Sequence, residues 1–170
     1  VKAGQPFMLM EQTPSQQNWQ PYNSLKRPGV MRLQSWQAVA RGADTVMFFQ
    51  LRRSRGACEK YHSAVIEHVG HENTRVFREV ADLGRELSGL GDTLIDSRLD
   101  TRVGIVFDWD NYWAVEMSSG PTVALRYVPQ VSAWHEAFWS QNFPVDMVGV
   151  EADLSRYDVI VAPLLYMVTP

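Results

Sequence analysis

Short, almost purely apolar runs alternate with longer stretches of helical periodicity along this 170-residue sequence. Runs of this kind predict strands that are buried on both faces, as in a parallel sheet that helices cover on either side. Between the runs, residues 29–41, 74–90 and the second half of 121–142 fit helices. The alternation therefore predicts an α/β architecture throughout the chain. The predicted strands are Phe7–Met10, Thr45–Leu51, Val103–Phe107, Val145–Val150 and Asp158–Pro163.

The two helices predicted in the first half have recognisable ends. Gly42 is a suitable C-cap for the helix over residues 29–41. Thr74 can cap the helix over residues 74–90, which carries a continuous apolar stripe. The long Arg- and His-rich segment 52–72 reads as a loop, and long loops inside compact domains are usually functional. The positions at helical spacing are Val30, Leu33, Trp36, Gln37 and Ala40 in the first helix, and Val76, Phe77, Val80, Leu83, Leu87 and Leu90 in the second.

A polar break at Asp100–Arg102 separates two parts of the sequence, and we place a domain boundary near Leu99. The first part supplies two strands and two helices, which cannot bury their own faces. A closed parallel barrel needs eight strands, each followed by a helix. Residues 1–99 are therefore predicted to be the last quarter of a (β/α)8 TIM barrel. Residues 100–170 are predicted to begin a doubly wound domain of the flavodoxin or glutamine-amidotransferase type.

Composition and charge exclude several classes of function. The formal net charge of -3 argues against nucleic acid as a partner, because a phosphate binder needs a basic face. No apolar run approaches the roughly 18 residues that span a bilayer, so we expect no membrane association. The first residues, 1–5, lack the charged and apolar regions of a signal peptide, so we expect a cytoplasmic location.

The cysteines and histidines predict neither a metal nor a cofactor. Cys58 is the single cysteine, which excludes an internal disulfide and a cysteine-rich metal site. His62, His68 and His71 do not match a known metal-ligand spacing. We therefore expect chemistry that amino-acid side chains perform alone.

The sequence after the third predicted strand allows two interpretations. Asp108, Asp110 and Asn111 follow that strand, as phosphate- or metal-binding acids do in some doubly wound folds. The Gly-rich loop of nucleotide-binding folds does not follow, so nucleotide binding is weakly supported. Trp109 and Trp113 are better explained by packing on a neighbouring domain or subunit.

Glu11 is the first candidate for a catalytic residue. It ends a predicted buried strand, and in a parallel barrel the carboxyl ends of the strands form the catalytic face. A carboxylate at such a place can attack an anomeric carbon as the nucleophile of a retaining glycosidase. The same position also fits a structural glutamate that caps the next turn or pairs with an arginine.

Two segments carry motifs specific enough for comparison with known families. In FMLMEQTPSQQNW, a strand ends in Met-Glu and is followed by a polar residue, a proline-containing turn and Asn-Trp. In FFQLRRSRGACEKYHSAVI, an aromatic residue, Gln and Arg precede a Gly, then Glu and His three apart, then Ser and Ala. These positions are Met10, Glu11, Gln12, Pro14, Asn18 and Trp19, and then Phe49, Gln50, Arg52, Gly56, Glu59, His62, Ser63 and Ala64. Together the two segments resemble glycoside hydrolase family 42, the β-galactosidases of that name.

This resemblance implies roles for individual residues. Glu11 would be the nucleophile that forms a galactosyl-enzyme ester in a retaining β-galactosidase. Trp19 and Phe49 would line the galactose subsite. Glu59 and His62 would hydrogen-bond the galactose hydroxyls, including the axial one that separates galactose from glucose.

The resemblance also implies an organisation for the whole protein. Residues 1–99 would be the C-terminal part of the TIM-barrel catalytic domain, and residues 100–170 the N-terminal part of a trimerisation domain. The parent protein would be a homotrimer that hydrolyses terminal β-D-galactosyl residues of β-galactoside oligosaccharides.

The residues themselves leave alternatives open. Without the resemblance, Glu59 and His62 fit a local salt-bridged turn, and the nearby arginines fit a solvated loop or a brace for acidic side chains. Other retaining barrel glycosidases, which act on β-glucosides or arabinosides, stay as an alternative function. So does a non-catalytic α/β assembly or ligand-binding module.

One component of the chemistry is missing from the sequence. A retaining glycosidase needs two carboxyl groups about 5 Å apart. In the family that it resembles, the acid/base is a Glu preceded by Asn on an earlier barrel strand. Here Glu72 and Asn73 stand in the reverse order, in a predicted loop. We therefore expect the acid/base to lie outside this chain and the isolated chain to be inactive.

Overall fold

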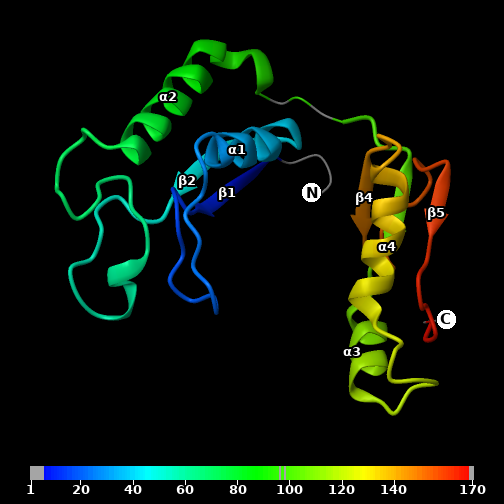
Figure 1. The fold of residues 1–170 in the computed structure, drawn as a ribbon. Helices are drawn as coiled ribbons and strands as arrows, with labels where there is room; N and C mark the ends of the chain where they lie inside the picture. The colour runs from blue at the N-terminus through cyan, green and yellow to red at the C-terminus, as the bar shows by residue number, and fades with distance from the viewer. Residues whose placement is uncertain (1–5, 96, 98, 169–170) are drawn as a thin grey trace. The chain divides into compact units, whose positions relative to one another are not determined.

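The computed structural model describes residues 6–95, 97 and 99–168. The chain divides into two compact units, residues 1–98 and 99–170. Each unit contains its own parallel sheet and its own helices (Figure 1). The α/β class predicted from the alternating runs is therefore confirmed.

In the first unit, β1 and β2 form a parallel pair that α1 connects, and α2 packs on α1. The second strand begins two residues before the predicted Thr45 and ends three residues before Leu51. The elements in chain order are β1 (Phe7–Gln12), α1 (Val30–Ala40), β2 (Ala43–Phe48), a 3-10 helix (Cys58–Tyr61), α2 (Arg75–Leu90) and a second 3-10 helix (Gly91–Leu94).

The two helices are joined by polar side chains as well as by apolar packing. Glu86 of α2 accepts hydrogen bonds from the Arg32 guanidinium at 2.8 Å and from the Trp36 indole at 3.0 Å. The hydroxyl of Thr74 accepts from the backbone N–H of Phe77, which confirms the predicted cap at the start of α2. The bonds of Glu86 to Arg32 and Trp36 hold α2 against α1.

The strand β1 is covered on one side and open on the other. Phe7 and Leu9 are partly buried, whereas Met8 and Met10 expose 53% and 72% of their surfaces. The prediction of a strand buried on both faces is therefore wrong for the described residues. The reason is that two strands and their helices, as this chain supplies them, can cover a sheet on one side but cannot close around it.

The helix α1 presents a different face to the core than its apolar spacing suggests. Its buried residues are Met31, Ser35 and Val39, whereas Leu33 is 68% exposed. Residues four apart lie on one stripe of a helix, so this stripe faces the interior. The hydroxyl of Ser35 donates to the Met31 carbonyl at 2.9 Å, which satisfies a polar group inside the stripe.

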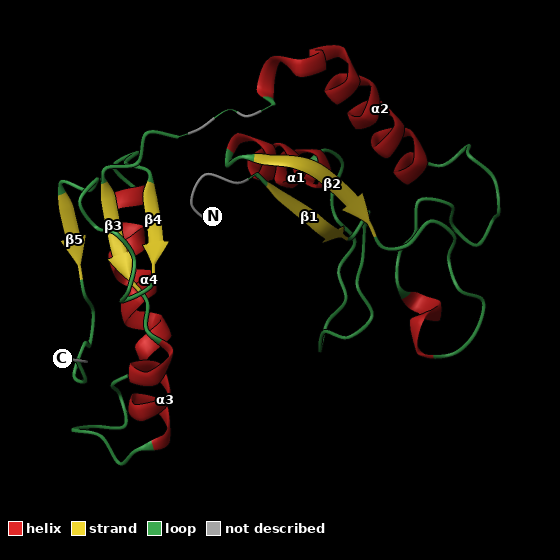
Figure 2. Cartoon of the chain, turned by 180° about the vertical axis from the view of Figure 1, so that it is seen from behind, coloured by secondary structure: helices red, strands yellow, loops and turns green. Residues whose placement is uncertain are grey.

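The second unit is a parallel sheet in the order β4-β3-β5, with the fully buried β3 in the middle (Figure 2). Ile105 of β3 packs against Tyr127 and Val131 of α4 to form the buried core. Its elements are β3 (Val103–Val106), α3 (Trp109–Met117), α4 (Tyr127–Trp139), β4 (Val145–Val148) and β5 (Val159–Val161).

The helix α3 was not predicted from the sequence. It begins after Asp108, whose carboxylate accepts from the backbone N–H of Asn111 at 2.9 Å. An aspartate in this position satisfies a free N–H group of the first turn and favours helix formation there. Asp108, which lies between the end of β3 and the first residue of α3, is therefore the N-cap of this helix.

Candidate active site

Glu11 lies one residue before the end of β1, where the pairing with β2 is irregular. Leu9 pairs with Val46 and Gln12 pairs with Phe48, so two residues of β1 face one residue of β2. Such a β-bulge bends the strand and redirects the side chains it contains. Glu11 is exposed, and among the described residues no hydrogen bond or ion pair engages its carboxylate. The bulge thus presents a free carboxylate at the carboxyl end of a parallel strand.

Phe49 and His62 meet directly beyond the end of β2. Their ring centroids lie 5.1 Å apart in an edge-to-face arrangement of 81°. His62 is only 2% exposed, and its Nδ1 lies 3.0 Å from the Ser63 carbonyl oxygen. Because a carbonyl oxygen can only accept, Nδ1 carries the hydrogen of this bond, and the tautomer with this hydrogen has Nε2 as its acceptor. The ring is therefore oriented by its own backbone and by Phe49.

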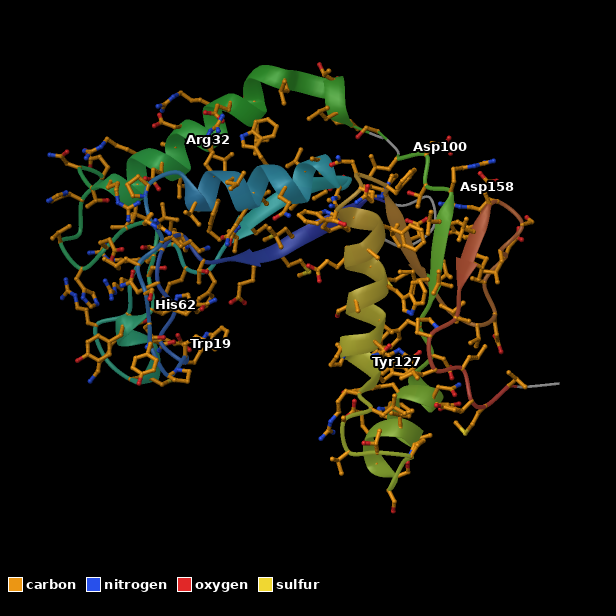
Figure 3. All side chains as sticks on the ribbon, turned by 45° about the vertical axis from the view of Figure 1, so that its right-hand side comes forward. Trp19, Arg32, His62, Asp100, Tyr127 and Asp158 are labelled. Carbon is orange, nitrogen blue, oxygen red and sulfur yellow. The ribbon has the colours of Figure 1, made fainter. Side chains whose placement is uncertain are left out.

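Hydrogen bonds join the loop after β1 to the loop around His62. The backbone N–H of Ser15 donates to the Ser63 hydroxyl at 2.9 Å, and the N–H of Ser63 donates to the Gln16 carbonyl at 2.9 Å. Further along, the side-chain amide of Asn18 donates to the Cys58 carbonyl. These bonds bring the segment with Trp19 next to the 3-10 helix that contains Glu59, and Figure 3 shows Trp19 and His62 among these loops.

Three buried polar atoms of this region lack partners. Among the residues that the structure describes, the buried side-chain atoms without a hydrogen-bond partner are Asn18 Oδ1, Gln50 Nε2 and Glu59 Oε2. Buried polar groups in proteins are nearly always paired, so unpaired ones call for a partner that the protein itself does not supply. Two of these atoms accept hydrogen bonds and one donates. A ligand rich in hydroxyl groups could satisfy all of them.

Arg53 stabilises the loop around His62, which follows β2. Its guanidinium donates to the carbonyl oxygens of Lys60 at 3.2 Å and Tyr61 at 3.0 Å, and it pairs with Glu67 at 2.6 Å. The Arg53–Glu67 pair is largely buried, and a guanidinium that makes several bonds is an effective brace. Arg53 therefore holds the backbone of the loop and does not pair with Glu11 or Glu59.

Lys26 is a charged residue of the site that sequence reasoning missed. Its ammonium group donates to the Gln12 side-chain oxygen at 2.7 Å and to the Thr13 carbonyl at 2.6 Å. Burial lowers the pKa of Lys26 from 10.5 to about 8. No local pattern reveals this role, because the acceptors lie 13 and 14 residues earlier in the chain.

The five predicted site residues are thus brought together to different degrees. Phe49 and His62 are in contact, and Trp19 and Glu59 lie on segments that one hydrogen bond joins. Glu11 lies on β1, whose last residue, Gln12, accepts a hydrogen bond from the N–H of Phe49 at 3.2 Å. All of them belong to the first unit.

Family models match nearly the whole chain. Residues 1–90 match the β-galactosidase model of glycoside hydrolase family 42, and residues 101–170 match the model of the β-galactosidase trimerisation domain. The chain belongs to glycoside hydrolase family 42. The match confirms the family that the two sequence motifs predicted.

Individual relatives agree with the family assignment. A β-galactosidase of Planococcus sp. strain L4 is 70% identical over 168 residues, which are 99% of this chain and 25% of that protein. The crystal structure of a β-galactosidase from Bacillus circulans sp. alkalophilus superimposes with a TM-score of 0.96 at 67% identity, covering 99% of this chain and 25% of that one. The chain therefore spans about a quarter of the length of the relatives that it matches.

A further structure concerns catalysis in this family. It is a catalytic Glu-to-Ala mutant of a family 42 β-galactosidase from G. stearothermophilus. It superimposes with a TM-score of 0.93 at 40% identity and covers 98% of this chain and 24% of that one. A glutamate is therefore catalytic in that relative.

Within residues 6–95, 97 and 99–168, no three His, Cys, Asp or Glu side chains are grouped closely enough to hold a metal ion. No helix in the same ranges combines the length and the apolar character that crossing a bilayer requires.

Proposed function

We propose that this family 42 chain is part of a retaining β-galactosidase, which hydrolyses terminal β-D-galactosyl residues through a covalent galactosyl-enzyme intermediate. The observation that carries the proposal is the carboxylate of Glu11 at the carboxyl end of a parallel strand, where no other described residue bonds to it. The catalytic glutamate of the relative from G. stearothermophilus supports a glutamate in this role. The full-length protein that would contain residues 1–170 is called the parent enzyme below.

The chemistry of the proposed reaction needs two carboxyl groups. In the first step, a carboxylate oxygen of Glu11 bonds to the anomeric carbon while the bond to the leaving oxygen breaks, and an acid protonates that oxygen. In the second step, the same acid, now a base, takes a proton from the water that hydrolyses the ester. We propose that another part of the parent enzyme supplies this acid/base, since no Asn-Glu pair occurs in the chain.

The loops that follow β1 and β2 carry suitable groups for a sugar. The free oxygens of Glu59 and Asn18 would accept hydrogen bonds from hydroxyl groups, and a bond to the Glu59 carboxylate belongs to the stronger, charge-assisted class. Nε2 of His62 would accept another. Trp19 is 64% exposed, so a face of its ring is open for packing on the apolar face of a galactose ring, and Phe49 would line the same subsite.

We also propose where the two units belong in the parent enzyme. Residues 1–99 would be the last quarter of the (β/α)8 catalytic barrel, whose missing strands would cover the open side of β1. Residues 100–170 would begin the trimerisation domain, as the start of a doubly wound sheet of flavodoxin or glutamine-amidotransferase type. The trimerisation-domain match and the parallel order β4-β3-β5 support this division and a homotrimeric parent.

The proposal is tested by trapping the intermediate on the parent enzyme. The probe is a 2-deoxy-2-fluoro-galactoside with a good leaving group, and the labelled peptide is mapped by mass spectrometry after digestion. We expect one label per active site, on Glu11. Replacing the nucleophile, Glu11→Gln, should lower kcat by at least about 1000-fold, since most of the covalent pathway is lost.

Glu72 provides the matched control, because it is an exposed glutamate in a loop of the same unit. Glu72→Gln should leave both the labelling and the turnover unchanged. A label on a residue other than Glu11, with turnover intact in Glu11→Gln, would contradict the proposed function.

A further inference from the structure

Lys26 connects three separate pieces of the first unit. Its ammonium group bonds to the Gln12 side chain at 2.7 Å and to the Thr13 carbonyl at 2.6 Å, at the end of β1. Its own carbonyl oxygen accepts from the guanidinium of Arg75 at 3.1 Å, at the first residue of α2. Lys26 therefore ties the strand end, the end of the loop that follows it, and α2 to one another.

The first consequence concerns the bulge that holds Glu11. Upstream of the bulge, Leu9 is fixed by its pairing with Val46. Downstream, the carbonyl oxygen of Gln12 accepts from the N–H of Phe49, and the side chain of Gln12 accepts from Lys26. A bulge re-aims the side chains that it contains. Because Gln12 directly follows Glu11, its bond to Lys26 restrains the end of the bulge from which the Glu11 side chain projects.

The second consequence concerns the loop over residues 13–25, which contains Trp19. The bonds from Lys26 to Gln12 and Thr13 close this loop at its base. Its first residues are held separately, by the bonds of Ser15 and Gln16 to Ser63. Its middle is held by the bond of Asn18, next to Trp19, to the Cys58 carbonyl. A loop held at its base and its middle keeps the nucleophile and the sugar platform at a fixed separation, and misplacement by about 1 Å can lower a rate roughly 100-fold.

We propose that Lys26 is a positioning residue for the nucleophile: its ammonium group fixes the strand end that carries Glu11 and closes the loop that carries Trp19. The proposal rests on the proposed function, because it assigns Lys26 to the same site. Lys26 acts through Gln12, which adjoins Glu11 in the chain, and Thr13, which is the next residue. It takes no part in the proton transfers of the reaction.

The test compares three variants of the parent enzyme. Lys26→Met removes the donor while keeping a long side chain, and Lys26→Arg restores a charged donor. Arg27→Met is the matched control, because Arg27 is the exposed cationic neighbour. For each variant, kcat, KM and the rate of labelling by the 2-deoxy-2-fluoro-galactoside are measured, and kcat is expressed per labelled active site. This normalisation removes any loss that is due to unfolded protein.

We expect Lys26→Met to lower kcat and the labelling rate by about 10- to 100-fold, with KM changed by less than about threefold. Lys26→Arg should recover most of the loss, and Arg27→Met should match the unchanged enzyme. A purely structural role would lower the number of labelled sites but leave kcat per site unchanged.

The outcomes separate this proposal from the proposed function. If the unchanged enzyme is labelled on Glu11 and Lys26→Met reacts at the unchanged rate per site, the role of Lys26 is overturned and the proposed function stands. If the unchanged enzyme is labelled elsewhere, the proposed function is overturned, and the role of Lys26 with it.

Discussion

The ammonium group of Lys26 loses solvation in the folded chain, and this has a consequence for stability. Burial lowers its pKa from 10.5 to about 8. Between about pH 8 and pH 10.5, the lysine at this position binds more protons in the unfolded chain than in the folded chain. The free energy of unfolding that Lys26 contributes therefore increases as the pH rises through this window. Below pH 8 the folded state bears the full cost of burying the charge.

This predicts a pH-dependent difference between the parent enzyme and its Lys26→Met variant, which has no group that titrates at this position. Other lysines and tyrosines titrate in both proteins and cancel in the comparison. The thermal midpoint of the unchanged enzyme should therefore rise relative to that of Lys26→Met between pH 7 and pH 10. A difference that is constant over this range would show that Lys26 has an ordinary pKa.

At the residue scale, the family resemblance assigned Phe49 and His62 to the galactose subsite, and contacts that depend on the path of the loop were missed. The rings of Phe49 and His62 are in contact, and their roles toward a sugar stay predictions. The bulge at Glu11 was not predictable, because it is set by the register of β1 against β2, which are more than 30 residues apart. Lys26 was missed because its acceptors, Gln12 and Thr13, lie 14 and 13 residues earlier in the chain.

At the element scale, Asn111 holds the start of α3 to the segment that follows β5. Its side-chain oxygen accepts from the N–H groups of Tyr166 and Met167, each at 2.8 Å, and its amide donates to the Met167 carbonyl at 2.9 Å. Asn111 is 1% exposed. The buried amide of Asn111 therefore links the first turn of α3 to residues 166 and 167, which follow β5.

Asn111→Ala should free this segment from α3. The N–H and the carbonyl of Met167 lose this partner, and the N–H of Tyr166 keeps only its bond to the Leu164 carbonyl at 3.0 Å. The cost is about 2 kcal/mol, which corresponds to about 30-fold more frequent local opening. Hydrogen exchange followed by mass spectrometry on the parent enzyme should show this acceleration at Met167. Asp110→Ala, on the exposed side of the same turn, is the control and should leave exchange there unchanged. Equal protection in both variants would contradict the role of Asn111.

Helices with an apolar stripe were predicted well, and α3 was not, for a physical reason. The stripe of α2 and its Thr74 cap place that helix to within a residue. In α3, aromatic and acidic residues are spread around the axis, and the only buried residue is the polar Asn111. Its start is determined by the Asp108 cap, a signal that periodicity does not detect.

At the scale of the whole molecule, the open side of β1 limits what the isolated chain can do. Met8 and Met10 point to the open side, and residues such as Met47 of β2 are also exposed, so the pair presents apolar surface and unpaired strand edges. The proposed retaining mechanism also needs a second carboxyl group about 5 Å from the nucleophile, and we propose that another part of the parent enzyme supplies it. A chain that spans a quarter of its relatives' length would hold Glu11 without that partner.

We therefore expect the 170-residue chain alone to hydrolyse an aryl β-galactoside no faster than its own Glu11→Ala variant, and to self-associate in size-exclusion chromatography. The comparison with Glu11→Ala controls for traces of host galactosidase, which would act equally in both samples. If the isolated chain turned over the galactoside and Glu11→Ala abolished that turnover, the acid/base would have to lie within residues 1–170. Any candidate would then have to be a carboxyl group that the loops of the first unit can bring to Glu11. Glu59, whose Oε2 has no partner among the described residues, would be the first to replace.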